Sequence, residues 1–316
     1  MRRRAASVLL ALLVTVESGC TTPTPDVTAL SPRPGEVSPL LWRATSPNGG
    51  TFYMLGSVHI GRGGAPKMGP IVDAAWDRAE ELVVEVDVSR VSEAELSALM
   101  ERWGQLESGR EIWPLLGPDT SRQLRAYLER RPSDPVSLAS MKPWFLAMVV
   151  MQLELRRYGY NIESSVDKLF IDRAAGRKKI VALETMDSQL QALDRLPAAL
   201  QERMLNDELS RIDRLEQDTE DLIEAWRLGD EKALEKLVFR PLEDSPEFEV
   251  FYELVFFRRN EQMAIGLENL GRDGRSRFVV IGAGHLLGDR SVPARLAQRG
   301  YRIERIRSVS QLARSR

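Results

Sequence analysis

The chain has 316 residues, of which 43% are hydrophobic and 28% are charged. Its 44 basic and 46 acidic residues give a formal charge of -2 and are spread along the chain, so no basic stripe is available for a phosphate backbone and nucleic acid is not an expected partner. After the first twenty residues the longest apolar run, residues 143–153, falls well short of the ~20 residues that a membrane-spanning helix needs.

Residues 1–19 have the pattern of a secretory signal, with three arginines, an apolar stretch over residues 5–16 and small residues at a cleavage position. Cys20 follows, the only cysteine of the chain, in a run that resembles a bacterial lipobox although Glu17 stands where an aliphatic residue is usual. We therefore expect an exported protein, lipid-anchored through Cys20 at the bacterial outer membrane or in the periplasm. A plain signal-peptidase cut, with Cys20 present by chance, is the alternative.

Residues 20–39 are rich in Thr, Pro and Ser and predict a flexible, extended tether between the membrane and the folded body. Because no second cysteine exists, the body has no disulfide and its stability must come from the apolar core. The pattern predicts one folded domain over residues 40–310.

A β-hairpin is predicted at the start of this domain. Its strands are residues 40–45 and 51–55, joined by the turn Pro47-Asn48-Gly49-Gly50. The second strand runs into Gly56-Ser57-Val58-His59, followed by a Gly-rich loop and a helical pattern over residues 70–80.

The apolar run Leu82 to Asp87 is typical of a parallel strand that is buried on both faces, except for the carboxylates of Glu85 and Asp87 at its end. The region over residues 92–271 is then predicted to be mainly helical, with Ser92 and Asp119 as helix N-caps.

Within the helical middle, Pro143 should open a strongly apolar helix that runs to Leu155. A strand over residues 179–183 ends at Glu184. Interruptions are expected near Gly229-Asp230 and over residues 241–246.

The chain closes with a strand over residues 277–281, then Gly282-Ala283-Gly284-His285, a short helix near residues 292–298 and a last strand over residues 301–306. The segment Phe278 to Leu286 aligns with Phe52 to Ile60, which indicates one unit used twice. The predicted fold class is therefore α/β, with a mixed sheet built from two similar strand-GxxH-helix-strand units and the large helical insertion between them.

Four predicted strands end in a side chain that can bind a metal or move a proton: His59, Glu85, Glu184 and His285, the two histidines being the only ones in the chain. Side chains just past the carboxyl ends of parallel strands share one edge of the sheet, so we expect the two imidazoles to lie close together. Two imidazoles and a carboxylate can hold a divalent ion of the Zn, Mn or Co type, and His59, His285 and Glu85 are the predicted metal ligands.

The predicted catalytic residues are Glu85 and Glu184 with Arg259 and Asn260, whose guanidinium and amide could bind a substrate carboxylate or oxyanion. Each has an ordinary alternative. Either glutamate could instead be the partner of a buried arginine, Arg259 and Asn260 could be surface groups of an amphipathic helix, and Asp87 could be a solvated strand end or an N-cap. A histidine after a strand is often a structural, hydrogen-bonded residue.

In this order, these residues resemble the TraB/GumN family, which is related to the animal Tiki proteins. The resemblance covers residues 41 to 306. It rests on Leu55-Gly56-Ser57-Val58-His59, Val84-Glu85-Val86-Asp87, Lys142-Pro143-Trp144, Val166-Asp167 through Arg173-Ala174, Leu183-Glu184-Thr185 with Gln189, Arg259-Asn260, and Gly282-Ala283-Gly284-His285-Leu286.

Tiki proteins act as metal-dependent peptidases, and the resemblance implies the same catalytic roles for His59, His285 and Glu85. We expect Glu184 to assist them. It therefore implies a metal-dependent hydrolase of the cell envelope that cleaves a peptide bond in a peptide or protein substrate. The family is also similar in fold to a haem-binding lipoprotein. This similarity implies the alternative of a non-enzymatic envelope lipoprotein that binds haem, iron or a peptide.

Overall fold

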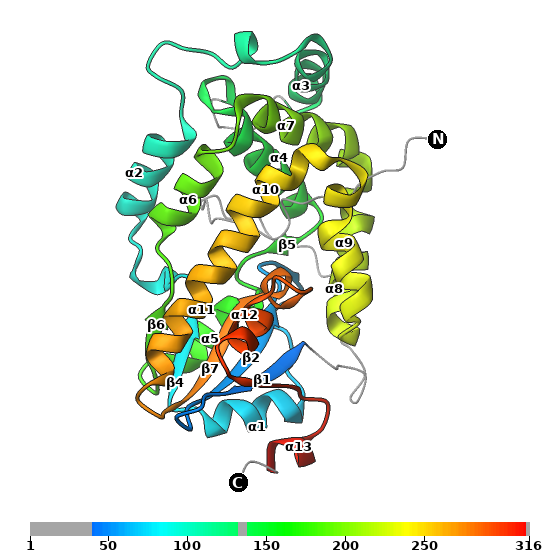
Figure 1. Ribbon diagram of the computed structural model, residues 1–316. Coiled ribbons are helices and arrows are strands. Elements are labelled where there is room, and N and C mark those ends of the chain that lie inside the picture. The colour runs from blue at the N-terminus through cyan, green and yellow to red at the C-terminus, as the bar shows by residue number, and fades with distance from the viewer. Residues whose placement is uncertain (1–39, 132–137, 314–316) are drawn as a thin grey trace.

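The computed structural model describes residues 40–131 and 138–313, which form a β-sheet with helices on both faces and a helical body beyond one end (Figure 1). The predicted signal sequence, the lipid anchor at Cys20 and the tether over residues 20–39 lie outside the described residues. No helix in the described part of the chain is long and apolar enough to cross a membrane.

The sheet begins with the predicted hairpin, in which β1 (Leu41–Thr45) and β2 (Thr51–Ser57) pair antiparallel. Gly49 makes the connecting turn possible, because its φ of 90° lies in the left-handed region that glycine adopts without strain. The hairpin prediction is confirmed.

Six strands form the sheet in the order β6-β4-β7-β2-β1-β8. The additional strands are β4 (Glu81–Val84), β6 (Lys179–Ala182), β7 (Ser276–Gly282) and β8 (Arg302–Arg305). The pairs β2–β7, β7–β4 and β4–β6 are parallel, whereas β1 pairs antiparallel with β8, so the sheet is mixed. A separate pair is formed by β3 (Gly61–Arg62) and β5 (Tyr160–Asn161).

The helices enclose the sheet and build the helical body. In chain order they are α1 (Pro70–Arg78), α2 (Glu93–Gly104), α3 (Pro118–Arg130), α4 (Pro143–Arg157), α5 (Val166–Ala174), α6 (Met186–Asp194), α7 (Ala198–Arg211), α8 (Leu215–Leu228), α9 (Glu231–Asp244), α10 (Glu249–Tyr252), α11 (Arg258–Gly271), α12 (Val292–Gln298) and α13 (Val309–Ala313).

Alternate side chains of the central strands pack on opposite faces of the sheet, as the two-residue period of a strand requires. Phe278 and Val280 of β7 share a core with α1 and α5, whereas Val279 and Ile281 share another with α11 and α12. Because both faces are covered, β2, β4 and β7 are buried, which explains their near-continuous apolar sequences.

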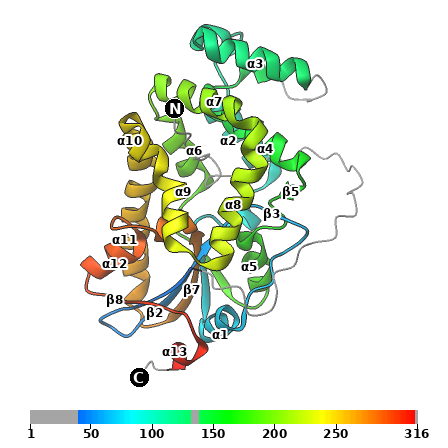
Figure 2. The ribbon, with the colours of Figure 1, turned by 90° about the vertical axis from the view of Figure 1, so that its right-hand side faces the viewer.

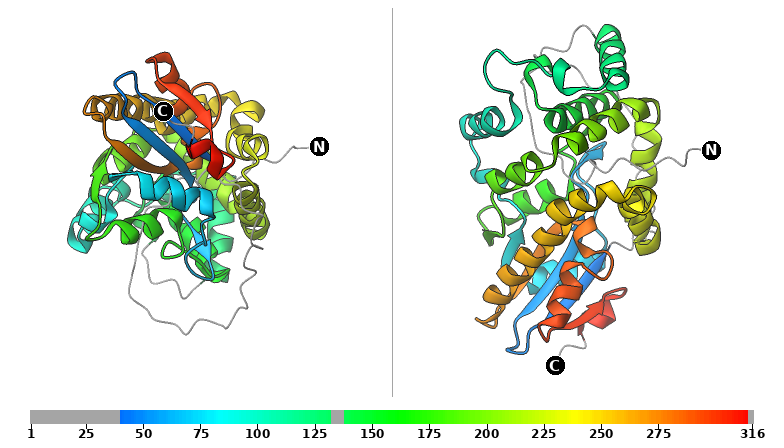
Figure 3. Two further views of the ribbon diagram at one scale, coloured as in Figure 1. Left: turned by 90° about the horizontal axis from the view of Figure 1, so that it is seen from below. Right: turned by 45° about the horizontal axis from the view of Figure 1, so that its top comes forward.

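The helical body has its own core around α4, which begins at Pro143 as predicted and is buried along most of its length. Figures 2 and 3 show this body beyond one end of the sheet, with α11 continuing from it along the sheet. The predicted interruption at Gly229 is confirmed, since α8 ends there with a left-handed residue. The second interruption follows α9, which ends at Asp244.

The N-cap prediction is confirmed at one position and wrong at the other. Ser92 Oγ accepts the N–H of Glu95 at 3.2 Å and caps α2. At α3 the cap position belongs to Gly117, and Asp119 instead lies in the first turn, where it pairs with Arg122. Pro118 causes the shift, because a proline without an N–H is favoured at the first helical position.

The α/β class and the mixed sheet are confirmed. Both Gly-x-x-His segments follow neighbouring parallel strands, with Ser57 opposite Gly282 at the end of β2 and β7. They differ locally, since the second forms a 3₁₀ turn over Ala283–Leu286 and the first runs into β3. That the two segments are copies of one unit stays a prediction.

Candidate functional site

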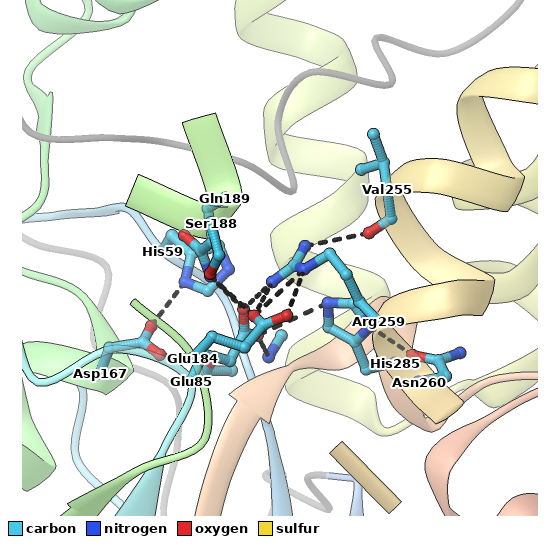
Figure 4. Close-up of polar contacts among 12 residues, drawn as sticks. His59, Glu85, Asp167, Glu184, Ser188, Gln189, Val255, Arg259, Asn260 and His285 are labelled. Atoms are coloured by element: carbon cyan, nitrogen blue, oxygen red, sulfur yellow. Dashed lines mark hydrogen bonds and ion pairs between the residues drawn. The ribbon is translucent and has the colours of Figure 1, made fainter. Parts of the chain in front are cut away.

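The candidate site lies at the carboxyl ends of four adjacent parallel strands (Figure 4). His59 follows β2, His285 follows β7, Glu85 follows β4 and Glu184 follows β6. The last two strands stay paired beyond their ends, because the N–H of Glu184 donates to the carbonyl of Glu85 at 2.8 Å. The strand order therefore brings together the four residues that the sequence places at strand ends.

Gly282 is the point on which three of these side chains converge. A Cβ at this position would lie 3.1 Å from His59 Nε2, 3.2 Å from Glu85 Oε1 and 3.5 Å from His285 Cδ2. The backbone of Gly282 has a φ of -50°, which any residue can adopt, so it is the space and not the conformation that requires glycine. The two imidazole rings lie close together, as the sheet order led us to expect.

His59 is held by Asp167, which lies in the first turn of α5. Its Nδ1 is 2.9 Å from Asp167 Oδ2, and the hydroxyl of Ser57 donates to Asp167 Oδ1 at 2.9 Å. Burial works to lower the pKa of His59, but the charge of Asp167 and the hydrogen bond to it outweigh burial and raise the pKa to about 9.

His285 is held by Asn260 of α11. Its Nδ1 lies 2.5 Å from Asn260 Oδ1, while the amide nitrogen of Asn260 donates to the carbonyl of Arg290 at 2.9 Å. Its Nε2 is 3.7 Å from Glu85 Oε1. Burial, with no charged partner on the Nδ1 side, lowers the pKa of His285 to about 3, so this imidazole is neutral.

Glu85 and Glu184 share a buried arginine. Arg259 Nη2 donates to Glu85 Oε2 at 2.6 Å and to Glu184 Oε2 at 2.7 Å, and its Nη1 donates to the carbonyl of Val255 at 3.0 Å. Gln189 Nε2 lies 3.1 Å from one oxygen of each carboxylate. The interpretation of both glutamates as partners of a buried arginine is confirmed, and their catalytic roles stay predictions.

Glu85 is ionised at neutral pH. Burial works to raise the pKa of Glu85, but the charges of Arg259 and His59 and the N–H of Gly282, which donates to Glu85 Oε1 at 2.6 Å, lower it. Both oxygens of Glu85 therefore have hydrogen-bond donors.

The alternative of Arg259 and Asn260 as surface groups is wrong, because they are 6% and 1% exposed. Only their neighbour Arg258 is on the surface, where its side chain is 67% exposed. Asp87 is an N-cap, as one alternative held, since its carboxylate accepts the N–H of Ser89 at 3.2 Å and caps the 3₁₀ turn Val88–Arg90.

Sequence reasoning missed two contributors to the site as residues with a role, namely Asp167 and Gln189. Both appear among the residues that carry the family resemblance, and that was their only signal. It also missed the π-helical segment Glu253–Phe257 between α10 and α11, which directly precedes Arg259 and Asn260. Single π turns inside helices are frequent at functional sites.

A metal site is not ready-made in this arrangement. Within residues 40–131 and 138–313, no group of three or more His, Cys, Asp or Glu side chains is arranged to hold a metal ion. His59 Nε2, Glu85 Oε1 and the Cδ2 edge of the His285 ring nevertheless surround the small space at Gly282 that a Cβ would fill, and His285 Nε2 lies 3.7 Å from Glu85 Oε1. Two nitrogens and one carboxylate oxygen are a donor set that suits zinc and related divalent ions.

Comparison with known protein families places the folded region in a family. A family model described as TraB/PrgY/gumN family matches residues 40–305, which include the whole sheet and the helical body. No curated protein and no solved structure matches the chain.

Proposed function

Because this chain belongs to the TraB/PrgY/gumN family over residues 40–305, we propose that it is a metal-dependent hydrolase of the cell envelope that cleaves a peptide bond in a peptide or protein substrate. The observation that carries the proposal is the convergence of His59, His285 and Glu85 on Gly282. Family membership alone does not fix a reaction, so the proposal depends on this geometry.

His59 and His285 would hold a divalent ion through their Nε2 atoms, and Glu85 through Oε1. When bound, such an ion supplies Lewis-acid chemistry, which polarises a peptide carbonyl and activates water. Asp167 and Asn260 orient the two rings, since they occupy both Nδ1 atoms and leave Nε2 of each ring to bind the ion. His59 Nε2 faces Gly282, and His285 Nε2 lies 3.7 Å from Glu85 Oε1.

Arg259 holds the carboxylates of Glu85 and Glu184 close together by donating to both. Its donors go to these carboxylates and to the carbonyl of Val255, so its first role is to fix the two glutamates. We propose that Glu85 acts as ligand or general base and that Glu184 assists by holding or moving a proton beside it. Binding of a substrate oxyanion by Arg259 would require it to release one of these partners.

The test is metal analysis of the purified protein together with titration of Zn²⁺ into three variants. We expect one bound divalent ion in the wild type, and loss of at least tenfold in Zn²⁺ affinity in His59→Ala and His285→Ala. Gly282→Ala should weaken binding as well, because its methyl group would occupy the space that the three groups face.

Gly176→Ala is the control for Gly282→Ala. This glycine has a φ of 68° and no neighbour within 4 Å of an added Cβ, so its substitution strains the backbone away from the site. It should therefore lower stability without weakening Zn²⁺ binding. A wild type that takes up no divalent ion under any loading condition would refute the proposed function.

One observation favours the binding-protein alternative, namely that both oxygens of Glu85 already have hydrogen-bond donors. A non-enzymatic lipoprotein that binds haem, iron or a peptide has no need of a general base. It predicts that Glu85→Gln spares ligand binding and that added haem produces a shifted Soret band, whereas the hydrolase predicts neither.

A further inference from the structure

Each of the two histidines is held by a hydrogen bond at its Nδ1 atom, and the two partner residues lie on helices that are far apart in the sequence. Asp167 on α5 holds Nδ1 of His59, and Asn260 on α11 holds Nδ1 of His285 (Figure 4). Each of these holding residues is fixed by a second hydrogen bond. Asp167 accepts from the Ser57 hydroxyl, and Asn260 donates to a backbone carbonyl.

These contacts decide that Nδ1 of each ring is the hydrogen-bond donor to its partner residue. The carboxylate oxygen of Asp167 can only accept, and Asn260 turns its carbonyl oxygen toward His285 because its amide nitrogen is committed to the carbonyl of Arg290. Each Nδ1 is therefore a donor. The Nε2 atom of each ring is therefore the nitrogen that remains to bind a cation.

We call each histidine with the residue that holds its Nδ1 an arm of the site, namely Asp167–His59 and Asn260–His285. The two arms differ in charge. His59 has an ionisable carboxylate behind it, whereas His285 has a neutral amide. A carboxylate partner increases the basicity of a ligating imidazole more than an amide does.

The two Gly-x-x-His segments differ at the residue that could support a holding group. Ser57, which is 2% exposed, supplies the hydroxyl that holds Asp167, and the corresponding residue of the second segment is Ala283, which has none. The first segment therefore contains both His59 and Ser57, whose hydroxyl holds the partner of His59.

The geometry points to Asp167, supported by Ser57, and Asn260 as positioning residues of one shared cation site, with the Asp167–His59 arm contributing more to binding than the Asn260–His285 arm. This inference rests on the proposed function, because it assigns roles within the same site. It adds an order of importance that the family match does not supply.

The first experiment measures Zn²⁺ affinity of the full chain by competition titration. Outer groups that hold a ligating histidine are typically worth 10–100-fold in metal affinity. We expect about a 100-fold loss in Asp167→Ala, about tenfold in Asn260→Ala, and an intermediate loss in Asp167→Asn, which keeps a hydrogen-bond acceptor and removes the charge. Ser57→Ala should lose less than Asp167→Ala.

Asp172→Asn is the matched control. Asp172 lies on the same helix α5, but its side chain is 60% exposed and pairs with Lys168, so this variant should bind Zn²⁺ as the wild type does. Equal losses in Asp167→Ala and Asn260→Ala, or a larger loss in the latter, would overturn the order of the two arms.

The second experiment is NMR of the metal-free protein, which separates this inference from the proposed function. With only two histidines, the wild type should show two slowly exchanging Nδ1–H signals, and Asp167→Ala and Asn260→Ala should each remove one. If each variant removes one signal but no Zn²⁺ binds, the positioning of the two rings by Asp167 and Asn260 stands, whereas the hydrolase and the order of contributions to cation binding are refuted. If the variants change neither signals nor affinity, the positioning roles are refuted while Zn²⁺ binding stands.

Discussion

Arg259 is the residue on which the charge balance of the candidate site depends. It is the cation between the carboxylates of Glu85 and Glu184, whose side chains are 9% and 10% exposed. A buried ion pair gives little net stability compared with apolar residues of the same volume, but the removal of one partner leaves an uncompensated charge. The two neighbouring carboxylates therefore depend on Arg259, which donates to both of them, for much of their charge compensation.

Arg259→Gln should consequently lower the free energy of unfolding by about 3–5 kcal/mol, as measured by urea denaturation at neutral pH. Arg258→Gln is the neighbouring control and should change the free energy by no more than about 0.5 kcal/mol, because that side chain is exposed. If the two variants have the same free energy of unfolding, Arg259 does not compensate the charges of Glu85 and Glu184.

At the scale of secondary structure, the π-helical segment Glu253–Phe257 is the element most specific to the site. It joins α10 in the helical body to α11 along the sheet, and Arg259 Nη1 bonds back to the carbonyl of Val255 within it. Asn260 follows on the same helix. The position of this wide turn thus determines which residues of α11 are presented to the strand ends.

A second element-scale feature is the end of α8, where Gly229 adopts a φ of 63° and its N–H bonds back to the helix. Gly229→Ala should lower the free energy of unfolding by about 1 kcal/mol, because a Cβ disfavours the left-handed conformation. Gly229→Asn should recover part of this loss, since Asn tolerates that conformation. Urea denaturation measures both variants. If Gly229→Asn has no higher free energy of unfolding than Gly229→Ala, the interpretation of Gly229 is wrong.

At the scale of the whole molecule, the candidate site lies where the carboxyl ends of the parallel strands meet the helical body. Its residues come from strand ends, from α5 and α6, and from α11, so both parts of the fold must be in place to form it. All of them lie within residues 40–313. We propose that Cys20 carries a lipid and that this lipid only attaches the unit to the membrane.

Cys20→Ser should therefore transfer the expressed protein from the membrane fraction to the soluble envelope fraction, while its melting temperature and Zn²⁺ affinity stay those of the wild type. Cell fractionation followed by immunoblotting measures the first effect. His285→Ala provides the reverse control, because it should remain with the membrane and bind Zn²⁺ more weakly. A Cys20→Ser protein that stays membrane-bound would rule out this anchor.

The sequence by itself determined the elements of the main sheet but not the ends of its strands, since the strand expected to run to Asp87 ends at Val84 as β4. The hairpin, the buried strands, the start of α4 and the placement of His59 and His285 after strands follow from local periodicity and turn residues, which neighbours in the chain specify. The errors at this level were also local, as at Asp119, where the preference of Pro118 for the first helical position decided the cap.

Only the tertiary structure decided which groups share the site. The insertion of β7 between β4 and β2, the burial of Arg259, and the pairing of His59 with Asp167 depend on contacts between residues about a hundred or more positions apart. Such contacts carry no local periodicity. Asp167 and Gln189 look like ordinary polar residues of helices in the sequence, and their roles exist only because the packed sheet places their helices against the strand ends.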